Sequence, residues 1–257
     1  MTSRTTCRIV FWNIQHGGGS RAVGIIEQLL EWNPDIIALA EFRGTAPSQS
    51  IAQRLFDNGY EYQVSAVNAD EPTWNAVFLA SRFKLKHVAL PLPEVPYGDL
   101  YWLLAKVEAM QPFHVGVVHA PWSIYLGRLE YYAALLNVTR EWQLGRGLII
   151  GDTNAGISGL DEETENSVEY NETFMKPMRS LGWHDIYRRF FPDANTPTWN
   201  SPYGNGYRLD QAFVNAELQA RVTSCDYDWG KNVDKGELSD HAAILLDLDL
   251  GSATEST

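Results

Sequence analysis

The sequence predicts an α+β fold in which two packed β-sheets are flanked by helices. Nine or more apolar segments rich in β-branched and aromatic residues favour strands, and only a few segments have helical periodicity. Several of the expected strands follow one another directly, which favours packed sheets. Since the 257 residues contain no repeat and no linker, we expect a single domain over residues 1–250 and a disordered tail over 251–257.

The first expected element is a strand at Arg8–Ile14, and the three glycines after it predict a flexible turn. Ser20 is expected to cap a helix that runs to about Trp32, because Pro34 prevents the helix from continuing. The run Asp35–Ala40 predicts a fully buried strand. This half of the chain is completed by a helix near Pro47–Asn58 and by strands at Glu61–Val67, Ala76–Ser81, Leu85–Leu90, Tyr101–Glu108 and Phe113–His119.

The second half begins with a longer expected helix over Leu126–Trp142, followed by a buried strand at Gly147–Gly151. Residues 171–190 are expected to be mainly helical. The last expected elements are strands at Tyr207–Val214, Ala220–Tyr227 and Ala242–Leu248.

Polar side chains stand at the ends of these apolar runs, and they are Asn13, Glu41, His119, Asp152, Asn154, Asp210, Asp240 and His241. A single Asp at a strand end is usually a turn former or a helix cap, and a single strand His is more often structural than catalytic. Turn formation and helix capping do not readily explain why so many polar residues stand at strand ends in this order. Side chains at strand ends can meet at one edge of a sheet, where a site is both preorganised and accessible.

These residue types supply what metal-assisted phosphoester hydrolysis needs. A hard cation such as Mg²⁺ prefers carboxylates, which Glu41 and Asp240 offer, and Asn13 adds a neutral oxygen. Asp210 and His241 form a pair in which a carboxylate can orient a histidine toward a water. Asn154 and His119 can donate hydrogen bonds to the charge that develops on phosphorus.

The order of six motifs resembles that of the endonuclease/exonuclease/phosphatase superfamily, whose fold is the DNase I-like four-layer αββα sandwich of mainly antiparallel sheets. The motifs are FWNIQ, PDIIALAE, VVHAP, IIGDTN, YRLDQAF and LSDHAAI. They span about Arg8 to Asp249, and the last three are together highly specific, whereas SDH alone would mean little.

The resemblance implies a role for each matching position and a cofactor, Mg²⁺ or Mn²⁺. It implies that Glu41 is the main metal ligand, with Asn13 and Asp240 in or beside the metal's shell. Asp210 would orient His241, Asp152 would contact the attacking water or the leaving group, and Asn154 would bind the scissile phosphate. His119 would bind the phosphate or protonate the leaving oxygen. Either Asp152 or His241 can take the proton of the water.

Two segments resemble the exonuclease III and abasic-site endonuclease branch, YRLDQAF and the RLEYY at residues 128–132. Two features differ from it. His119 stands where that branch has a tyrosine, and HAPWSIYLGRLEYY lacks the Pro-Asn pair and the following basic residue. The acidic segment Asp161–Glu172 is either a solvated loop or a flap that repels duplex phosphates.

Four further residues are candidates for substrate binding. Arg43 and Arg128 can bind phosphate, and Trp199 and Tyr207 can stack on a base or a sugar, because they lie near the motifs above. The alternative for the aromatic residues is that they only support long loops. Arg208, two residues before Asp210, is either a further candidate for binding phosphate or a structural residue.

The net charge of −12 argues against a protein that holds nucleic acid mainly by counterion release. Either the substrate is small, or phosphate binding is local and metal-assisted. We expect a Mg²⁺- or Mn²⁺-dependent phosphodiester hydrolase, foremost a nuclease acting on DNA, with a phosphatase of a small phosphoester or phospholipid head group as the alternative. A binding module with a decayed site is disfavoured because every motif position is present. We expect a cytoplasmic monomer without a membrane segment.

Overall fold

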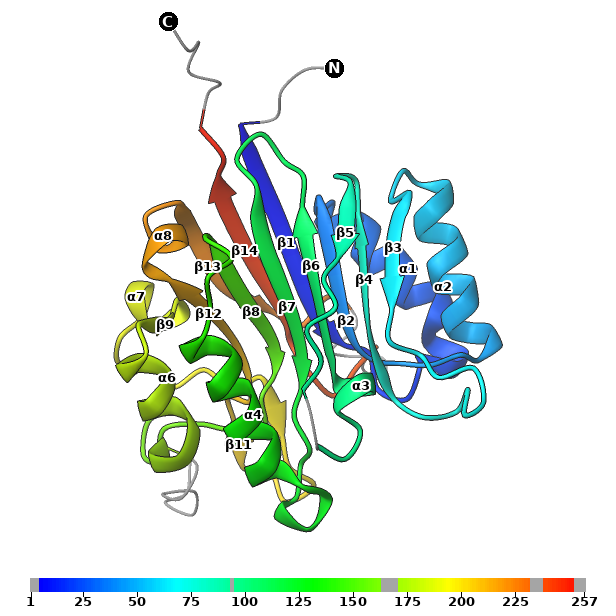
Figure 1. Cartoon of the computed structure of the whole chain (residues 1–257). Coiled ribbons are helices and arrows are strands. Elements are labelled where there is room, and N and C mark those ends of the chain that lie inside the picture. Colours follow the sequence, from blue (N-terminus) through cyan, green and yellow to red (C-terminus); the bar gives the residue numbers. More distant parts are fainter. Residues whose placement is uncertain (1–4, 93–94, 163–170, 232–237, 252–257) are drawn as a thin grey trace, which may run out of the picture.

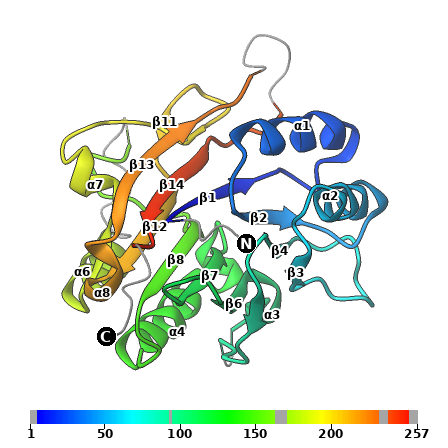
Figure 2. The same cartoon turned by 90° about the horizontal axis from the view of Figure 1, so that it is seen from above.

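The computed structural model describes residues 5–92, 95–162, 171–231 and 238–251. Two six-stranded sheets pack face to face. Helices α1 (Ala22–Trp32) and α2 (Ala46–Asp57) cover the outer face of one sheet, and α4 (Arg128–Arg140) and α6 (Lys176–Ser180) cover the outer face of the other (Figures 1 and 2). The predicted sandwich of two sheets flanked by helices is therefore confirmed.

The first sheet has the strand order β13-β14-β1-β2-β4-β3. Its strands are β1 (Thr6–Asn13), β2 (Ile36–Phe42), β3 (Tyr62–Ser65), β4 (Ala76–Ser81), β13 (Val222–Asp228) and β14 (Ala243–Asp249). Only β1 and β2 pair in parallel in this sheet, as the described strands show.

The second sheet has the order β5-β6-β7-β8-β12-β9, again with one parallel pair at its centre, β7 with β8. Its strands are β5 (Leu85–His87), β6 (Trp102–Val107), β7 (Phe113–His119), β8 (Gly147–Asp152), β9 (Trp183–Asp185) and β12 (Asp210–Asn215). A small ribbon of β10 (Trp199–Asn200) and β11 (Gly206–Tyr207) stands apart from both sheets. Short helical segments complete the described fold, namely η1 (Gly19–Arg21), α3 (Gly98–Tyr101), η2 (Ile124–Leu126), η3 (Asn171–Met175), α7 (Tyr187–Phe190) and α8 (Ala216–Gln219).

The core has three layers because both faces of the central strands are covered. Along β1, Ile9 and Phe11 point between the sheets, whereas Val10 and Trp12 pack toward α1 and α2. A third cluster fills the space between the second sheet and α4. A strand buried on both faces needs apolar residues at successive positions, which explains the unbroken apolar runs of the sequence.

Two local expectations were wrong, those for Ser20 and for the strand 207–214. Ser20 does not cap α1, because it lies inside η1 and Arg21 takes the N-cap position without a side-chain hydrogen bond. Residues 171–190 are mainly helical, as expected, but they also contain the strand β9, which follows Gly182 in a left-handed conformation. The expected strand 207–214 is split between β11 and β12, because Arg208 turns its guanidinium into a buried cluster of acidic side chains.

The topology brings the polar strand ends together at one edge of the sandwich. The parallel strands β1 and β2 end there, as do β7 and β8. Strands β12 and β14 run antiparallel to β8 and β1, so they begin at the same edge, and Asp210 lies directly opposite Asp152. The chain termini lie at the other end of the molecule (Figure 1). Within the described residues, no helix combines the length and the apolar character that a membrane span requires.

Candidate active site

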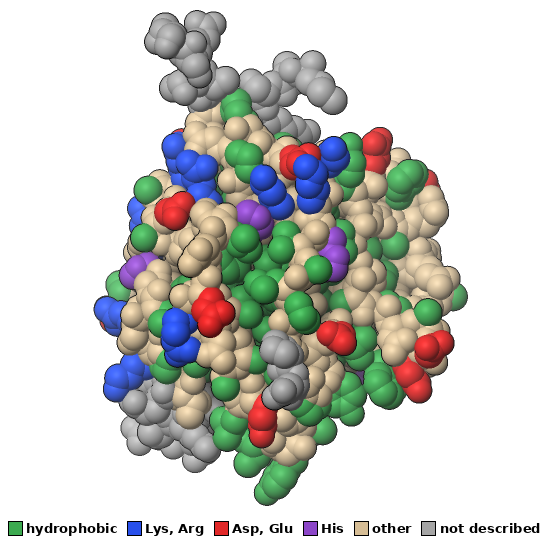
Figure 3. Space-filling view, viewed as in Figure 1, with side chains coloured by type: hydrophobic (Ala, Val, Ile, Leu, Met, Phe, Trp, Pro, Cys, Tyr) green, Lys and Arg blue, Asp and Glu red, His purple; other side chains and the backbone are tan. Residues whose placement is uncertain are grey.

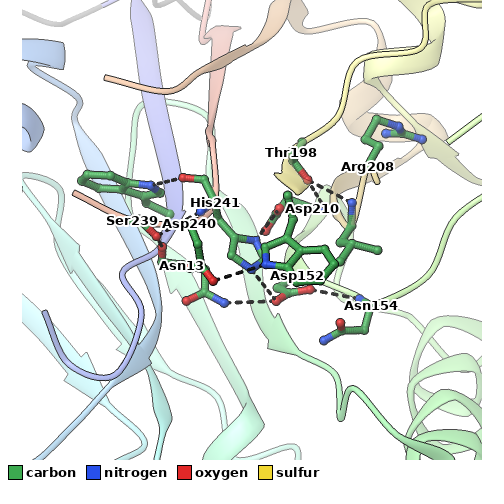
Figure 4. A network of polar contacts seen from close by, with 12 residues as sticks. Asn13, Asp152, Asn154, Thr198, Arg208, Asp210, Ser239, Asp240 and His241 are labelled. Atoms are coloured by element: carbon green, nitrogen blue, oxygen red, sulfur yellow. Dashed lines mark hydrogen bonds and ion pairs between the residues drawn. The ribbon is translucent and has the colours of Figure 1, made fainter. Parts of the chain in front are cut away.

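A buried Asp–His pair joins the two sheets at this edge. Nδ1 of His241, just before β14, lies 2.9 Å from Oδ2 of Asp210, the first residue of β12 (Figure 4). The backbone of His241 is fixed on both sides, since its N–H donates to Oγ of Ser239 and its carbonyl accepts from the Trp12 indole. Because Nδ1 faces Asp210, Nε2 faces the centre of the site, 3.9 Å from Oδ2 of Asp152.

The surroundings of this pair shift two pKa values in a way that separates an acid from a base. Burial lowers the pKa of His241, but the carboxylates of Asp210, Asp152 and Asp240 outweigh it and raise that pKa to about 10. Burial, and then the charge of Asp210, raises the pKa of Asp152 to about 7. At neutral pH the imidazole therefore carries a proton, and the Asp152 carboxyl is poised to take one.

Glu41 enters the site through an unusual backbone conformation. It has φ +56°, next to an irregularity in the β2–β4 pairing between Leu39 and Phe42. A non-glycine residue in this region is disfavoured, and such residues concentrate at functional sites. Its carboxylate accepts the backbone N–H of His16 at 2.7 Å. Burial raises the pKa of Glu41, but His119 and His16 outweigh burial and hold that pKa below its usual value.

Asn13 and His119 connect Glu41 to Asp152. Nδ2 of Asn13 lies 3.1 Å from Asp152 and 3.4 Å from Glu41, and its Oδ1 accepts the N–H of Gln15. Nε2 of His119 lies 3.9 Å from an oxygen of each carboxylate. Two carboxylates, an amide and an imidazole thus converge on one small volume.

The donor set fits a hard divalent cation. Carboxylate oxygens are ligands that Mg²⁺ prefers, and Glu41 and Asp152 present them side by side, both within reach of the Asn13 amide nitrogen. The raised pKa of Asp152 shows a buried carboxylate whose charge is not fully compensated by its neighbours, and a cation relieves such charge. Among the described residues, ligating atoms of Asp152, Asp210 and His241 also lie within 4.8 Å of one another. Of these three residues, Asp210 and His241 are already paired with each other through Oδ2 and Nδ1.

Asp240 and Asn154 flank this centre. An oxygen of Asp240 accepts the Trp199 indole N–H at 3.2 Å, so this carboxylate is oriented by the β10–β11 ribbon. Asn154 follows β8 with φ +48°, and its N–H donates to Asp152. Its side-chain nitrogen donates to the carbonyl of Ala120, directly after His119.

A small cavity of about 150 Å³ is lined by Asn154 and by three of the four predicted substrate-binding residues, Arg128, Trp199 and Tyr207. The rings of Trp199 and Tyr207 lie 5.9 Å apart. Arg43 lies instead on the Glu41 side, where Nη2 is 2.9 Å from Nδ1 of His16 and Nε donates to Asn75.

Several residues of the site carry no signal in the sequence that would identify them. Tyr101, whose ring lies 4.9 Å from that of His119, carries no motif. Asn75 carries none either, because only its contact with Arg43 reveals it. A signal for the backbone contact of His16 with Glu41 was present in the glycine run 17–19, which shapes a tight turn after Asn13.

Of the two roles considered for Arg208, the structure supports the structural one, in which Arg208 pairs with the start of the acidic segment. Its guanidinium is fully buried and binds Asp161 and Asp185. Asp161 also contacts Arg188 and is itself buried, so the start of the segment is not solvated. Residues 163–170 lie outside the described part of the chain.

Comparisons with solved structures support the fold. An AP endonuclease from Archaeoglobus fulgidus is 21% identical, with a TM-score of 0.79 over 95% of this chain and 99% of that one. NExo, a 3′ phosphatase from Neisseria bound to a product DNA hairpin, is 20% identical, with a TM-score of 0.78 and the same coverage. A humanized TDP2 from D. rerio is 16% identical, with a TM-score of 0.71 and again the same coverage.

Among curated proteins, no sequence matches this chain. The family model described as Endonuclease/Exonuclease/phosphatase family matches residues 10–241. This range contains the described site from Asn13 to His241, and the family match indicates a phosphoester hydrolase. The chain belongs to the endonuclease/exonuclease/phosphatase family.

Proposed function

We propose that this protein is a divalent-cation-dependent phosphodiester hydrolase that acts on DNA. The observation that carries the proposal is the convergence of Glu41, Asn13 and Asp152 beside the Asp210–His241 pair. Two structural neighbours support the choice of DNA, an AP endonuclease and a 3′ phosphatase bound to a DNA hairpin. The cavity lined by Trp199 and Tyr207 offers aromatic surface to a sugar or base beside the scissile phosphate.

Glu41 and Asn13 would hold the cation, Mg²⁺ or Mn²⁺, with Asp240 adding negative charge nearby. When bound, such a cation neutralises charge on the phosphate and favours displacement at phosphorus. Glu41 suits this role because its lowered pKa keeps it ionised, and the His16 N–H fixes its orientation.

Asp152 is the proposed general base and His241 the proposed charge-stabilising donor. Asp152 accepts a hydrogen bond from Asn13, which orients its carboxylate, and its pKa of about 7 suits proton abstraction at neutral pH. His241 stays protonated and donates from Nε2 toward a phosphate oxygen. His119 and Asn154 flank the same volume and complete the phosphate contacts.

The proposal is tested with a supercoiled plasmid, a duplex with one abasic site and a panel of small phosphoesters, each with Mg²⁺, Mn²⁺ or EDTA. EDTA-sensitive cleavage of either DNA that disappears in His241→Ala supports the proposal and shows whether abasic sites are preferred. Intact DNA together with hydrolysis of a small ester supports the alternative, a small-molecule phosphatase. The net charge of −12 and the 150 Å³ cavity favour that second candidate.

A further inference from the structure

A line of aromatic rings leads from His119 to the protein surface on the Glu41 side. The ring of Tyr101 lies 4.9 Å from that of His119, the ring of Tyr97 lies 5.7 Å from Tyr101, and the ring of Trp74 lies 5.5 Å from Tyr97. His119 is 8% exposed, whereas Tyr97 and Trp74 are 41% and 42% exposed. We call Trp74, Tyr97 and Tyr101 the aromatic ledge. It starts at the proposed reaction centre and ends in solvent.

The ledge is joined to a basic side chain of the site. Nε of Arg43 donates to Oδ1 of Asn75, the residue after Trp74. The loop that carries Trp74 is held against the segment after Arg43, because the N–H of Gly44 donates to the carbonyl of Pro72 at 2.8 Å. A Cβ on Gly44 would stand only 2.9 Å from Pro72, so a glycine permits this close approach. The loop position is therefore built into the fold.

The backbone of Tyr97 adopts a left-handed conformation that glycine adopts more readily than tyrosine. Tyr97 has φ +61° and ψ +12°, at the start of α3, where its carbonyl accepts the N–H groups of Leu100 and Tyr101. This left-handed region favours glycine and asparagine and is unusual for a large aromatic residue. Since the turn itself would be better served by glycine, the tyrosine ring is explained by what it contacts. Strain of this kind concentrates at ligand-binding positions.

We propose that the aromatic ledge, with Arg43, binds unpaired nucleobases that flank the scissile phosphate, so that the preferred substrate has a single-stranded segment on the Glu41 side. This inference rests on the proposed function. Bases of an unpaired strand can stack on exposed aromatic rings, while those of an intact duplex are already stacked on one another. Stacking also requires little positive surface, in agreement with the net charge of −12.

The distribution of charge on the visible face agrees with this choice. In Figure 3, Lys and Arg side chains gather mainly toward the end with the chain termini and along one side, while hydrophobic side chains protrude at the opposite end. The proposed site lies toward that opposite end (Figure 1). A duplex held by its phosphates needs a basic track beside the reaction centre. A single strand held by its bases does not.

The test uses Trp74→Ala and Tyr97→Gly, with Trp122→Ala as the matched control. Trp122 is 72% exposed and follows His119 by three residues, but it is not part of the ledge. Binding of a fluorescein-labelled 12-nucleotide single strand and of the matching duplex is measured by anisotropy in EDTA. Hydrolysis of bis(p-nitrophenyl) phosphate with Mg²⁺ and the melting temperature are measured for each variant.

We expect both ledge variants to raise the Kd for the single strand about fivefold or more, the range of one lost base stack. Duplex binding, ester hydrolysis and the control variant should stay within twofold of wild type. Tyr97→Gly should melt at the wild-type temperature or higher, because glycine relieves the backbone, whereas a purely structural tyrosine would lower it. Unchanged single-strand affinity in both ledge variants, or no single-strand binding by wild type, overturns the proposal. Loss of all hydrolysis in wild type with ledge-dependent binding intact overturns only the proposed function.

Discussion

Asp210→Asn tests the central step of the proposed reaction, because it removes one charge and changes few atoms. Asp210 is fully buried, and Oδ2 accepts the His241 Nδ1–H at 2.9 Å. Oγ1 of Thr198 accepts the backbone N–H groups of Leu209 and Asp210. These backbone contacts do not depend on the carboxylate, so we expect the variant to fold.

The expected effect follows from the pKa of His241. The net rise from the usual 6.5 to about 10 corresponds to about 5 kcal/mol in favour of the protonated ring. The acidic neighbours contribute more than this net figure, because burial acts against them. Without the Asp210 charge, burial is the main influence left, and burial lowers the pKa. The pKa of the ring therefore falls, and the Asn amide no longer fixes its tautomer. We expect kcat to fall on the order of 10³-fold or more, as for other oriented histidines.

The assay combines initial rates from pH 5 to 9 with NMR titration of the His241 ring and a melting curve. Asp193→Asn, an exposed acid that is remote from the described site contacts, is the matched control and should keep wild-type rates. A kcat for Asp210→Asn within about threefold of wild type would remove the pair from the mechanism. An unchanged His241 pKa would show that the carboxylate does not set the protonation state.

Three further predictions concern the metal, the buried ion pairs and the ledge. Glu41→Gln should raise the Mg²⁺ concentration for half-maximal activity on the order of 100-fold, because loss of a residue that only supports a ligand already lowers metal affinity about 10- to 100-fold. EDTA should abolish wild-type activity reversibly. Equal half-maximal Mg²⁺ concentrations for both proteins would contradict this role of Glu41. Asp161→Asn should lower the free energy of unfolding by about 3–5 kcal/mol in urea at pH 7, because it leaves the fully buried Arg208 short of a partner. Arg208 and Arg188 hold the pKa of Asp161 below its usual 3.8, although burial raises it. This stabilisation is therefore present above about pH 4 and is lost as the pH falls through the lowered pKa. A difference in unfolding free energy between wild type and variant that stays constant down to pH 2 is the contrary result. Gly44→Ala should displace Pro72 and weaken single-strand binding without changing ester hydrolysis, and anisotropy identical to wild type would show that the Trp74 loop is not held from Gly44.

Local sequence patterns predict the strands that are buried on both faces better than the short ones. The bounds of β4 and β7 match the expected strands residue for residue, because each is a continuous apolar run. β9 and β10 contain three and two residues, too few to show any period. Their positions depend on tertiary contacts, as in β9, which pairs only with β12 among the described strands.

The site also has one part that local sequence patterns predict and one part that they do not. The residues at the ends of the apolar runs converge in the structure, because strand direction fixes which ends share an edge. The contact of Asp161 with Arg208 joins residues 47 positions apart, and no local pattern predicts it. The same holds for Trp74 and Tyr97, which come from two separate loops and whose rings lie 5.5 Å apart.

The division of the site between the sheets explains why so many polar groups can be buried at this edge. Asn13 and Glu41 lie on strands of the first sheet, and His241 stands just before its strand β14. His119, Asp152 and Asp210 lie on strands of the second sheet. The hydrogen bonds from Asn13 to Asp152 and between His241 and Asp210 therefore both cross between the sheets. Each sheet alone would leave buried charges without partners, which is costly. Packing of the apolar faces of the two sheets supplies the missing partners, so the reaction centre forms only when the sandwich closes, and its polar contacts in turn fix how the two sheets are aligned.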